Sequence, residues 1–122
     1  MAQSEPEPSR VECSVTFLPA IKGGRSSPPT TSGGVYRPTL VTSDPTGRIA
    51  GTATADDSAD DHFGVAFLDG PAIAAADAEI VAVLLPLFRP MEMYDRFPPG
   101  SSFTVREGRR IVGYGVVRRW LR

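Results

Sequence analysis

Arginine is concentrated at the end of this chain, and its guanidinium group is well suited to bind phosphate. Residues 103–122 hold six arginines and a single acid, Glu107. Arg106, Arg109 and Arg110 surround a short polar stretch, where they could form a clamp for phosphate groups. Charged residues at a turn also keep the edge of a sheet soluble, so the same arginines have an ordinary structural explanation.

The middle of the chain carries the opposite charge. Between Asp44 and Glu79 there are eight acidic residues and one basic residue, Arg48, although the net charge of the chain is only −1. The basic end could therefore bind the phosphates of a nucleic acid, or it could pair with the acidic middle of its own fold. The sequence leaves both alternatives open.

A metal site is one alternative for the acidic stretch. His62 is the only histidine, and with Asp57, Asp60 and Asp61 it could bind a metal, because imidazole and carboxylates are suitable ligands. A solvated acidic loop is the more ordinary interpretation, and the run lacks the turn glycine of a calcium loop. We therefore predict no metal site.

Motifs for catalysis or nucleotide binding are also missing. The sequence has no glycine-rich phosphate loop ending in Lys-Ser or Lys-Thr, and no nucleophile elbow. The single cysteine, Cys13, alternates with Val11, Val15 and Phe17, which indicates a small core residue rather than a reactive thiol. We expect a protein that is not an enzyme, with no catalytic residue, no cofactor and no bound nucleotide.

Two aromatic residues near the C-terminus are candidates for contacts with nucleobases. Tyr114 and Trp120 could stack on bases, as aromatic side chains do in single-strand binding proteins. They alternate with Val112 and Val116 in one extended run, however, which favours a place in the core or at the rim of a sheet.

A proline-flanked segment, residues 88–100, is unusually apolar for a loop. It could cover the core or contact a partner protein, and the first interpretation is favoured. Its candidates for a partner interface are Met91, Met93, Tyr94 and Phe97.

Alternation of apolar and polar residues predicts the strands that must position these side chains. The pattern is clean over residues 11–17, and two extended runs meet at a polar turn containing Gly108, which is typical of a β-hairpin. Residues 72–87 approximate a helical face, but the β-branched run within them favours a turn followed by a strand. Further strands are expected at 35–42, 48–55, 62–68 and 79–87, with loops at 21–34, 56–61 and 88–100.

The composition agrees with many short strands. Twelve glycines and twelve prolines are scattered along 122 residues, which indicates frequent turns. Residues 1–9 are expected to form a disordered lead without the features of a secretory signal, followed by one domain at 10–122. No apolar stretch approaches the roughly 20 residues that cross a bilayer. We expect a cytoplasmic, all-β protein with about six antiparallel strands and no membrane contact.

Several motifs together resemble a known family. In this order along the chain, they are similar to the C-terminal (third) β-barrel domain of translation elongation factor Tu, across about residues 10–121 and without that factor's GTPase domain. The motifs are Gly23-Gly24-Arg25, Tyr36-Arg37-Pro38, Asp44-Pro45-Thr46-Gly47, Arg106-Glu107-Gly108 and Gly113-Tyr114-Gly115-Val116-Val117.

This resemblance implies a six-stranded antiparallel barrel that packs against a GTPase domain and grips the T-stem backbone of aminoacyl-tRNA. Arginine forks and hydroxyl groups can hold phosphates, and a glycine backbone can approach closely. Two registers are possible: the family's third strand matches either the segment after residue 48, or residues 62–68 with 44–61 as an insertion. The positions that match the family's RNA contacts are Arg25, Ser26, Thr39, Thr46, Gly108 and Arg109.

Two functional hypotheses follow from the resemblance and the arginines. The first is a non-enzymatic binding module associated with translation, whose partner is tRNA or another structured RNA. The second is a protein-interaction module that has kept the barrel and lost RNA binding, with a GTPase-like protein or a second copy of the chain as its partner.

Overall fold

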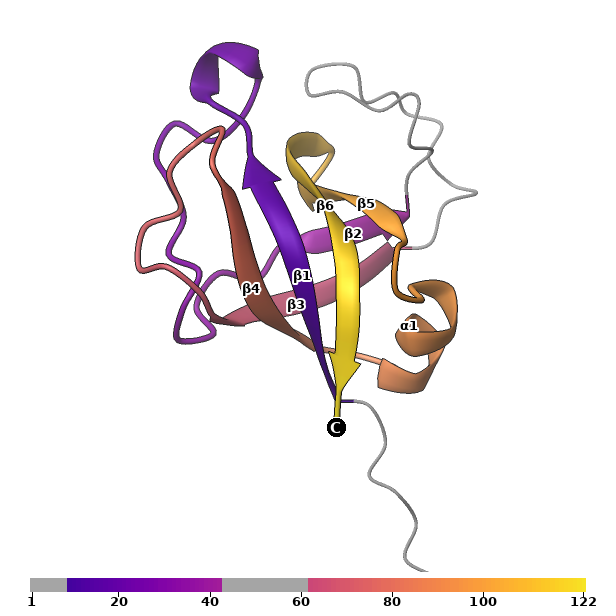
Figure 1. Ribbon diagram of the computed structural model, residues 1–122. Helices are drawn as coiled ribbons and strands as arrows, with labels where there is room; N and C mark the ends of the chain where they lie inside the picture. The colour runs from indigo at the N-terminus through magenta and orange to yellow at the C-terminus, as the bar shows by residue number, and fades with distance from the viewer. Residues whose placement is uncertain (1–8, 43–61) are drawn as a thin grey trace, which may run out of the picture.

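The computed structural model describes residues 9–42 and 62–122, and Figure 1 shows its architecture. Within these residues, six strands close into one antiparallel barrel in the order β1-β4-β3-β2-β5-β6. This confirms the predicted all-β, six-stranded antiparallel barrel. The strands are β1 Arg10–Phe17, β2 Thr39–Thr42, β3 His62–Asp69, β4 Glu79–Pro86, β5 Ser102–Glu107 and β6 Arg110–Leu121, with a 3-10 turn, η1, at Ala20–Lys22 and a helix, α1, at Pro90–Arg96.

Strand β1 shows how the sequence pattern produces the core. Val11, Cys13, Val15 and Phe17 are each at most 2% exposed, because successive side chains of a strand point to opposite faces. Burial raises the pKa of the Cys13 thiol to about 12, and the nearby carboxylate of Glu12 adds to the effect. The thiol is therefore protonated at neutral pH, and the prediction of a core cysteine is confirmed.

Strand β6 pairs with β1 on one side and with β5 on the other, and its glycines allow both neighbours to come close. A Cβ at Gly115 would lie 2.3 Å from the carbonyl oxygen of Ser14 and 2.6 Å from Cζ of Phe103. A Cβ at Gly113 would lie 2.8 Å from the carbonyl oxygen of Thr16. The two motif glycines therefore have a structural role, since no side chain fits at either position.

Residues 88–100 contain a helix where a loop was expected. Helix α1 begins with Pro90 in its first turn and ends before Phe97. Proline is favoured at the first helical position, where its missing N–H costs no hydrogen bond, so Pro90 starts a helix here rather than breaking one. Met93 and Phe97 are fully buried within the core cluster. The interpretation that this segment covers the core is confirmed for these two residues.

Strand β2 starts later than expected. The prediction placed a strand at residues 35–42, but β2 begins only at Thr39, after a proline that has no N–H for a ladder. The backbone upstream still follows β3, because the N–H of Phe67 donates to the carbonyl oxygen of Tyr36 at 2.9 Å. The expected strand at 48–55 lies outside the described residues.

The remaining strands agree with their predictions to within about a residue at most ends. β3 pairs with β2 on one side and with β4 on the other, so it lies between these two strands in the barrel wall. Residues 1–8 of the expected lead lie outside the described part of the chain. Ser9 is already attached to the barrel, because its N–H donates to the carbonyl oxygen of Leu121 at 3.0 Å.

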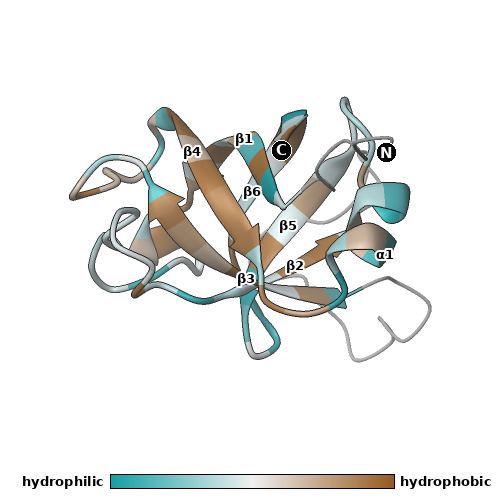
Figure 2. Cartoon of the chain, turned by 90° about the horizontal axis from the view of Figure 1, so that it is seen from below, coloured by the Kyte–Doolittle hydropathy of each residue, from teal (hydrophilic) through white to brown (hydrophobic). Residues whose placement is uncertain are grey.

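The barrel has two distinct ends. In Figure 1, η1 and the turn between β5 and β6 lie at the upper end, while the C-terminus lies at the opposite end. Figure 2 shows that hydrophobic residues are concentrated on the strands, and that the connecting turns are largely hydrophilic. The upper end therefore presents loops on a rigid base, including η1 with its exposed Ile21, and such loops are where recognition residues are commonly found.

Candidate nucleic-acid interface

The Gly23-Gly24-Arg25 motif turns the chain at the upper end of the barrel. Gly23 has a φ of +91°, and its N–H donates to the carbonyl oxygen of Ala20 at 3.0 Å, which closes η1. A Cβ on Gly24 would lie only 1.9 Å from the carbonyl oxygen of Leu18. Glycine is thus needed at both positions, once for its left-handed backbone and once for its small size. The turn fixes the position of Arg25.

Arg25, Tyr36 and Glu107 form a group that we call the tip cluster. The Arg25 guanidinium donates through Nη1 to Glu107 Oε2, and Nε donates to the carbonyl oxygen of Ser27 at 3.0 Å. Its Cζ lies 5.0 Å from the centre of the Tyr36 ring, a cation–π contact. The Tyr36 hydroxyl donates to the same Glu107 oxygen at 2.7 Å. One carboxylate therefore ties the first loop to the β5–β6 hairpin.

The tip cluster is partly shielded from solvent. The side chains of Arg25 and Glu107 are 29% and 31% exposed. The hydrogen bond to Glu107 raises the pKa of Arg25, while burial and then the bond to Glu107 raise the pKa of Tyr36 above its ordinary value. The charge of Arg25 is balanced within the protein, so this arginine attracts phosphate less strongly than an isolated one.

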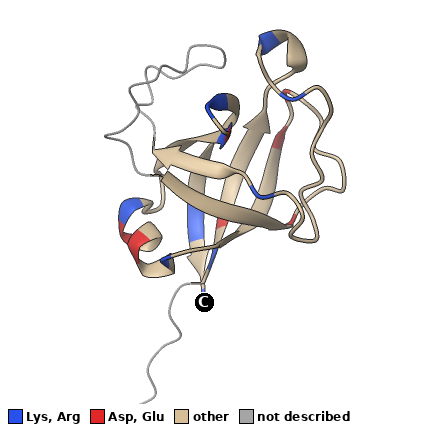
Figure 3. Cartoon of the chain, turned by 180° about the vertical axis from the view of Figure 1, so that it is seen from behind, with Lys and Arg blue, Asp and Glu red and all other residues tan. Residues whose placement is uncertain are grey.

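The β5–β6 turn lies directly beside the tip cluster. Gly108 has a φ of +63°, in the left-handed region that a tight turn requires. Arg109 and Arg110 come after it in the chain and are exposed. Figure 3 shows basic residues on η1 and on this turn, and a further basic stretch along the last part of β6. The exposed positive charge at this end therefore comes from Lys22 on η1 and from the two arginines of the turn.

The other predicted RNA contacts are distributed unevenly. Ser26 and Arg25 both line a small pocket of about 150 Å³. Thr39 lies opposite Arg106 in the β2–β5 register and is partly exposed. Thr46 lies outside the described residues. The structure thus brings the first loop and the hairpin turn together, while Thr39 lies one strand away in the wall.

Arg106 is not available for a surface clamp. The residue is only 2% exposed, and its Nε donates to Oγ1 of Thr104 at 3.1 Å. A buried guanidinium cannot reach the phosphates of a large ligand. The clamp suggested by the arginine spacing is therefore wrong for Arg106 and is reduced to Arg109 and Arg110.

The two aromatic candidates on β6 have different environments. Trp120 packs against the core, and its Nε1 donates to the carbonyl oxygen of Phe97 at 2.8 Å, in agreement with its predicted place. Tyr114 is 49% exposed and Val116 is 41% exposed, so both point outward from the barrel. Tyr114 is therefore not a core residue, because the glycines on either side of it occupy the inward positions of β6.

The apolar candidates for a partner interface are also divided. Met93 and Phe97 are fully buried and present no surface to a partner. Met91 is 43% exposed at the start of α1, and Tyr94 is partly exposed and packs edge-on against Trp120, with ring centres 5.4 Å apart. Of the four predicted partner-interface residues, only Met91 and part of Tyr94 are at the surface, where a partner could contact them.

The alternative metal site at His62 falls largely outside the described residues, because Asp57, Asp60 and Asp61 lie there. In the described ranges, 9–42 and 62–122, no three histidine, cysteine or carboxylate side chains gather as a metal-binding group.

Sequence reasoning missed the carboxylates that organise the arginines. Glu107 was noted only as the one acid of the basic end, yet it binds both Arg25 and Tyr36. Glu12, on the opposite part of the barrel, binds Arg118 and Arg119. The alternation in β1 indicated that Glu12 faces outward, but no signal in the sequence indicated which arginines it meets.

No protein-family model matches the chain, and no curated protein is significantly similar to it. Among the helices of the described residues, none has the length and apolar character needed to cross a membrane.

Proposed function

We propose that the barrel is a non-enzymatic RNA-binding module resembling the third domain of elongation factor Tu, and that it acts in translation. Its interface is the upper end of the barrel, and its ligand is tRNA or another structured RNA. The observation that supports this proposal is the meeting of Arg25 with the hairpin turn through Glu107, because the two motifs are 82 residues apart in the sequence.

The residues at this end have different roles in the proposed interface. Arg109, on the exposed turn, supplies a guanidinium fork to a phosphate of the RNA backbone. Gly108 keeps the turn narrow, so the backbone can approach the RNA. Arg25 and Ser26 form the opposite side, where Arg25 is held in a fixed geometry by Glu107 and contributes position more than net charge.

The proposal is tested by the salt dependence of RNA binding. Fluorescence anisotropy with a labelled tRNA transcript measures the affinity at several salt concentrations for the wild type and for a double variant, Arg25→Ala with Arg109→Ala. We expect at least about tenfold weaker binding, and a salt slope reduced by about 1 for each phosphate that the variant no longer binds. Arg89→Ala is the matched control, because Arg89 is exposed and belongs to the segment before α1.

The outcome that would overturn this function is simple to recognise. If the wild-type protein shows no salt-sensitive binding to tRNA, the proposal fails. It also fails if the double variant loses no more than twice the binding free energy that Arg89→Ala loses, because each removed charge would then cost the same wherever it lies.

A second candidate function is protein interaction, with a GTPase-like protein or a second copy of the chain as partner. It is favoured by two exposed apolar side chains, one before and one within α1: Phe88 is 74% exposed and Met91 is 43% exposed. Sedimentation of the wild type and of a Phe88→Ser, Met91→Ser variant over a range of concentrations tests self-association. A monomer at all concentrations, together with no binding to a purified translational GTPase, would exclude this candidate.

A further inference from the structure

The outer face of β6 carries exposed side chains that the tip interface does not use. Tyr114, Val116 and Arg118 point outward along this strand. In the antiparallel register, Ser14 of β1 lies between Val116 and Val81 of β4, and Val81 is 48% exposed. An aromatic ring, two aliphatic side chains and a hydroxyl thus form one surface over three adjacent strands.

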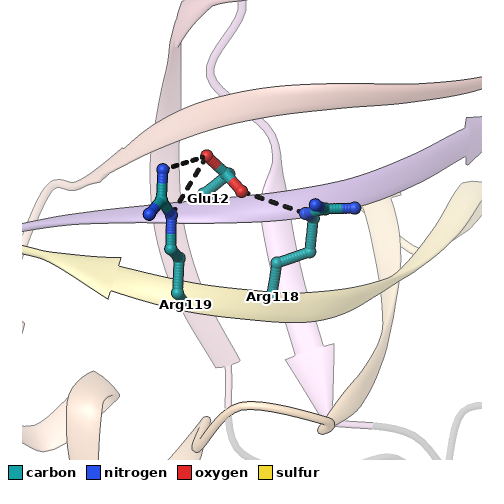
Figure 4. Close-up of polar contacts among 3 residues, drawn as sticks. All are labelled: Glu12, Arg118 and Arg119. Atoms are coloured by element: carbon teal, nitrogen blue, oxygen red, sulfur yellow. Dashed lines mark hydrogen bonds and ion pairs between the residues drawn. The ribbon is translucent and has the colours of Figure 1, made fainter.

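A bulge places two arginines at the end of this surface. Glu12 pairs with Arg119 and Cys13 pairs with Val117, so Arg118 is the extra residue in β6. A bulge of this kind redirects neighbouring side chains, and here both arginines reach one carboxylate. Figure 4 shows them on either side of Glu12.

The carboxylate uses only part of the hydrogen-bonding capacity of the pair. Nε of Arg118 donates to Oε2 of Glu12 at 2.9 Å, and Nε and Nη2 of Arg119 donate to Oε1 at 3.4 and 3.3 Å. The arginine side chains are 52% and 67% exposed, against 15% for Glu12. Each guanidinium has five N–H donors, so this group, which we call the bulge cluster, offers solvent-facing donors and an excess of one positive charge.

The bulge cluster lies in a shallow, solvent-open depression beside the exposed valine. Glu12, Val81, Arg118 and Arg119 line it. A phosphate in this space could accept from both guanidinium groups without displacing Glu12, because the carboxylate binds Arg118 through Nε alone.

We propose that the outer face of β6 binds single-stranded RNA, with a base stacked on Tyr114 and a phosphate held by Arg118 and Arg119. The inference rests on the proposed function in taking RNA as the ligand, but it assigns a separate surface. An aromatic ring and arginines on one exposed face combine base stacking with phosphate binding, as in proteins that bind single strands. Val116 provides the apolar contact between the two.

A single strand fits this face better than a duplex. In a duplex the bases are already stacked on each other, so Tyr114 could not reach a base face. Tyr114 and Arg118 are four positions apart, which corresponds to about 13 Å along an extended strand. Glu79 lies on β4 opposite Thr16, and its carboxylate disfavours phosphates on that side, so the strand is expected to follow β6.

The arginines of this surface are separate from the tip interface. Arg110 and Arg118 are eight residues apart on β6, which corresponds to about 26 Å, whereas Tyr114 lies midway between them. Variants of Arg118 and Arg119 should therefore leave the binding of structured RNA at the tip unchanged, and variants at the tip should leave the bulge cluster intact.

The experiment uses the full chain and a fluorescein-labelled hexauridylate, with anisotropy as the readout. Tyr114→Ala should weaken binding about tenfold or more, whereas Tyr114→Phe should keep it, because the ring that stacks is retained. Phe88→Ala is the matched control, since it removes an exposed aromatic ring elsewhere. An equal loss in Phe88→Ala would overturn the assignment to Tyr114.

Removing the arginines tests the phosphate contact. Arg118→Ala with Arg119→Ala should weaken hexauridylate binding and reduce the salt slope by up to about 1.4, at about 0.7 for each single-strand phosphate contact. Arg118→Ala alone leaves Glu12 paired with Arg119, so this variant should remain folded. It measures the phosphate contact if the double variant unfolds. Arg89→Ala, the matched control, should change neither quantity.

The results separate this inference from the proposed function. If tRNA binds through Arg109 but hexauridylate does not bind, or binds without dependence on Tyr114 and Arg118, the outer-face inference is wrong and the function stands. If hexauridylate binds as described and tRNA does not, the tip interface is wrong. If neither RNA binds, both proposals fail.

Discussion

The tip cluster and the bulge cluster are both built on glutamate–arginine ion pairs, but the two clusters have different roles. In each, one glutamate binds arginine from a distant part of the chain. Glu107 binds Arg25 and the hydroxyl of Tyr36, and Arg25 also packs on the ring of that tyrosine. Glu12 instead binds two arginines that are both more than half exposed. The exposure of the partner side chains therefore decides whether an ion pair stabilises the fold or keeps positive charge at the surface.

The physical basis of the difference is solvent screening. Exposed ion pairs contribute at most about 1 kcal/mol, because water and salt weaken them and the side chains must be ordered. Glu12 is itself less exposed than Glu107, at 15% against 31%, so the difference lies in the donors. Arg25 and Tyr36 are partly buried, and their hydrogen bonds contribute more because water cannot fully replace them when they are lost. Four variants test this difference, beginning with the most damaging.

Breaking β6 should disrupt both clusters together, because this strand connects them. Gly115→Ala would place a Cβ 2.3 Å from the carbonyl oxygen of Ser14, which is backbone and cannot yield easily. We expect a loss of about 3 kcal/mol or more in the free energy of unfolding, or no folding at all, measured by chemical denaturation. Gly64→Ala is the control, since its Cβ would meet nothing closer than 3.8 Å. Equal stability of the two variants would contradict the close approach.

Glu107→Gln should destabilise the protein clearly. The neutral amide cannot accept charge-assisted hydrogen bonds from both Arg25 and Tyr36, which remain partly buried. We expect a loss of about 1–3 kcal/mol in the free energy of unfolding. Urea denaturation of this variant beside Glu12→Gln compares the two clusters directly. A smaller loss for Glu107→Gln than for Glu12→Gln would reverse our ranking.

Tyr36→Phe should remove a pH-dependent contribution from the tip cluster. The folded pKa of Tyr36 is raised, so folding favours the protonated hydroxyl; its contribution is complete below the unfolded value of about 10 and is lost as the pH rises above it. The variant should lose about 1 kcal/mol at neutral pH and show a smaller decrease in Tm above pH 10. Thermal unfolding between pH 7 and 11 measures both. If the Tm of the wild type and of the variant decreased in parallel above pH 10, the pKa of Tyr36 would not be raised by folding.

Glu12→Gln should have the smallest effect on stability. The hydrogen bond from Arg118 is the main cause that lowers the pKa of Glu12 below 4.5, so its contribution is present above that pH and is lost as the pH falls below it. We expect a loss of less than about 1 kcal/mol at pH 7, and a shallower decrease in Tm between pH 5 and 3. A steep acid transition that is identical in the variant would show that Glu12 makes no contribution.

Much of the barrel was predictable because its signals are local. Alternation over 11–17 fixed the face of β1, and the turn at Gly108 marked the hairpin. The helix α1 was missed because seven residues give too little periodicity, and because Pro90 was interpreted as part of a loop. A proline at a helix start and a proline in a loop differ only in the residues after them, and here burial of Met93 against the core decides the outcome.

The candidate site was predictable only as a set of residues. The sequence singled out Arg25, Arg109 and Gly108, but it could not show that Arg106 is buried or that Tyr114 faces outward. Gly113 and Gly115 occupy the inward positions of β6 beside Tyr114, because β1 and the core rings lie too close for a larger residue. That constraint arises only when three strands pack together.

The strand pattern, the turns and the uneven distribution of charge can thus be read from the sequence alone, because each of these depends on neighbours along the chain. The partners of the arginines were decided only by the tertiary structure. Arg118 and Glu12 are 106 residues apart, and a single extra residue in β6 determines that two arginines, rather than one, meet that carboxylate. Register and bulges depend on packing between distant segments, and no local pattern encodes them.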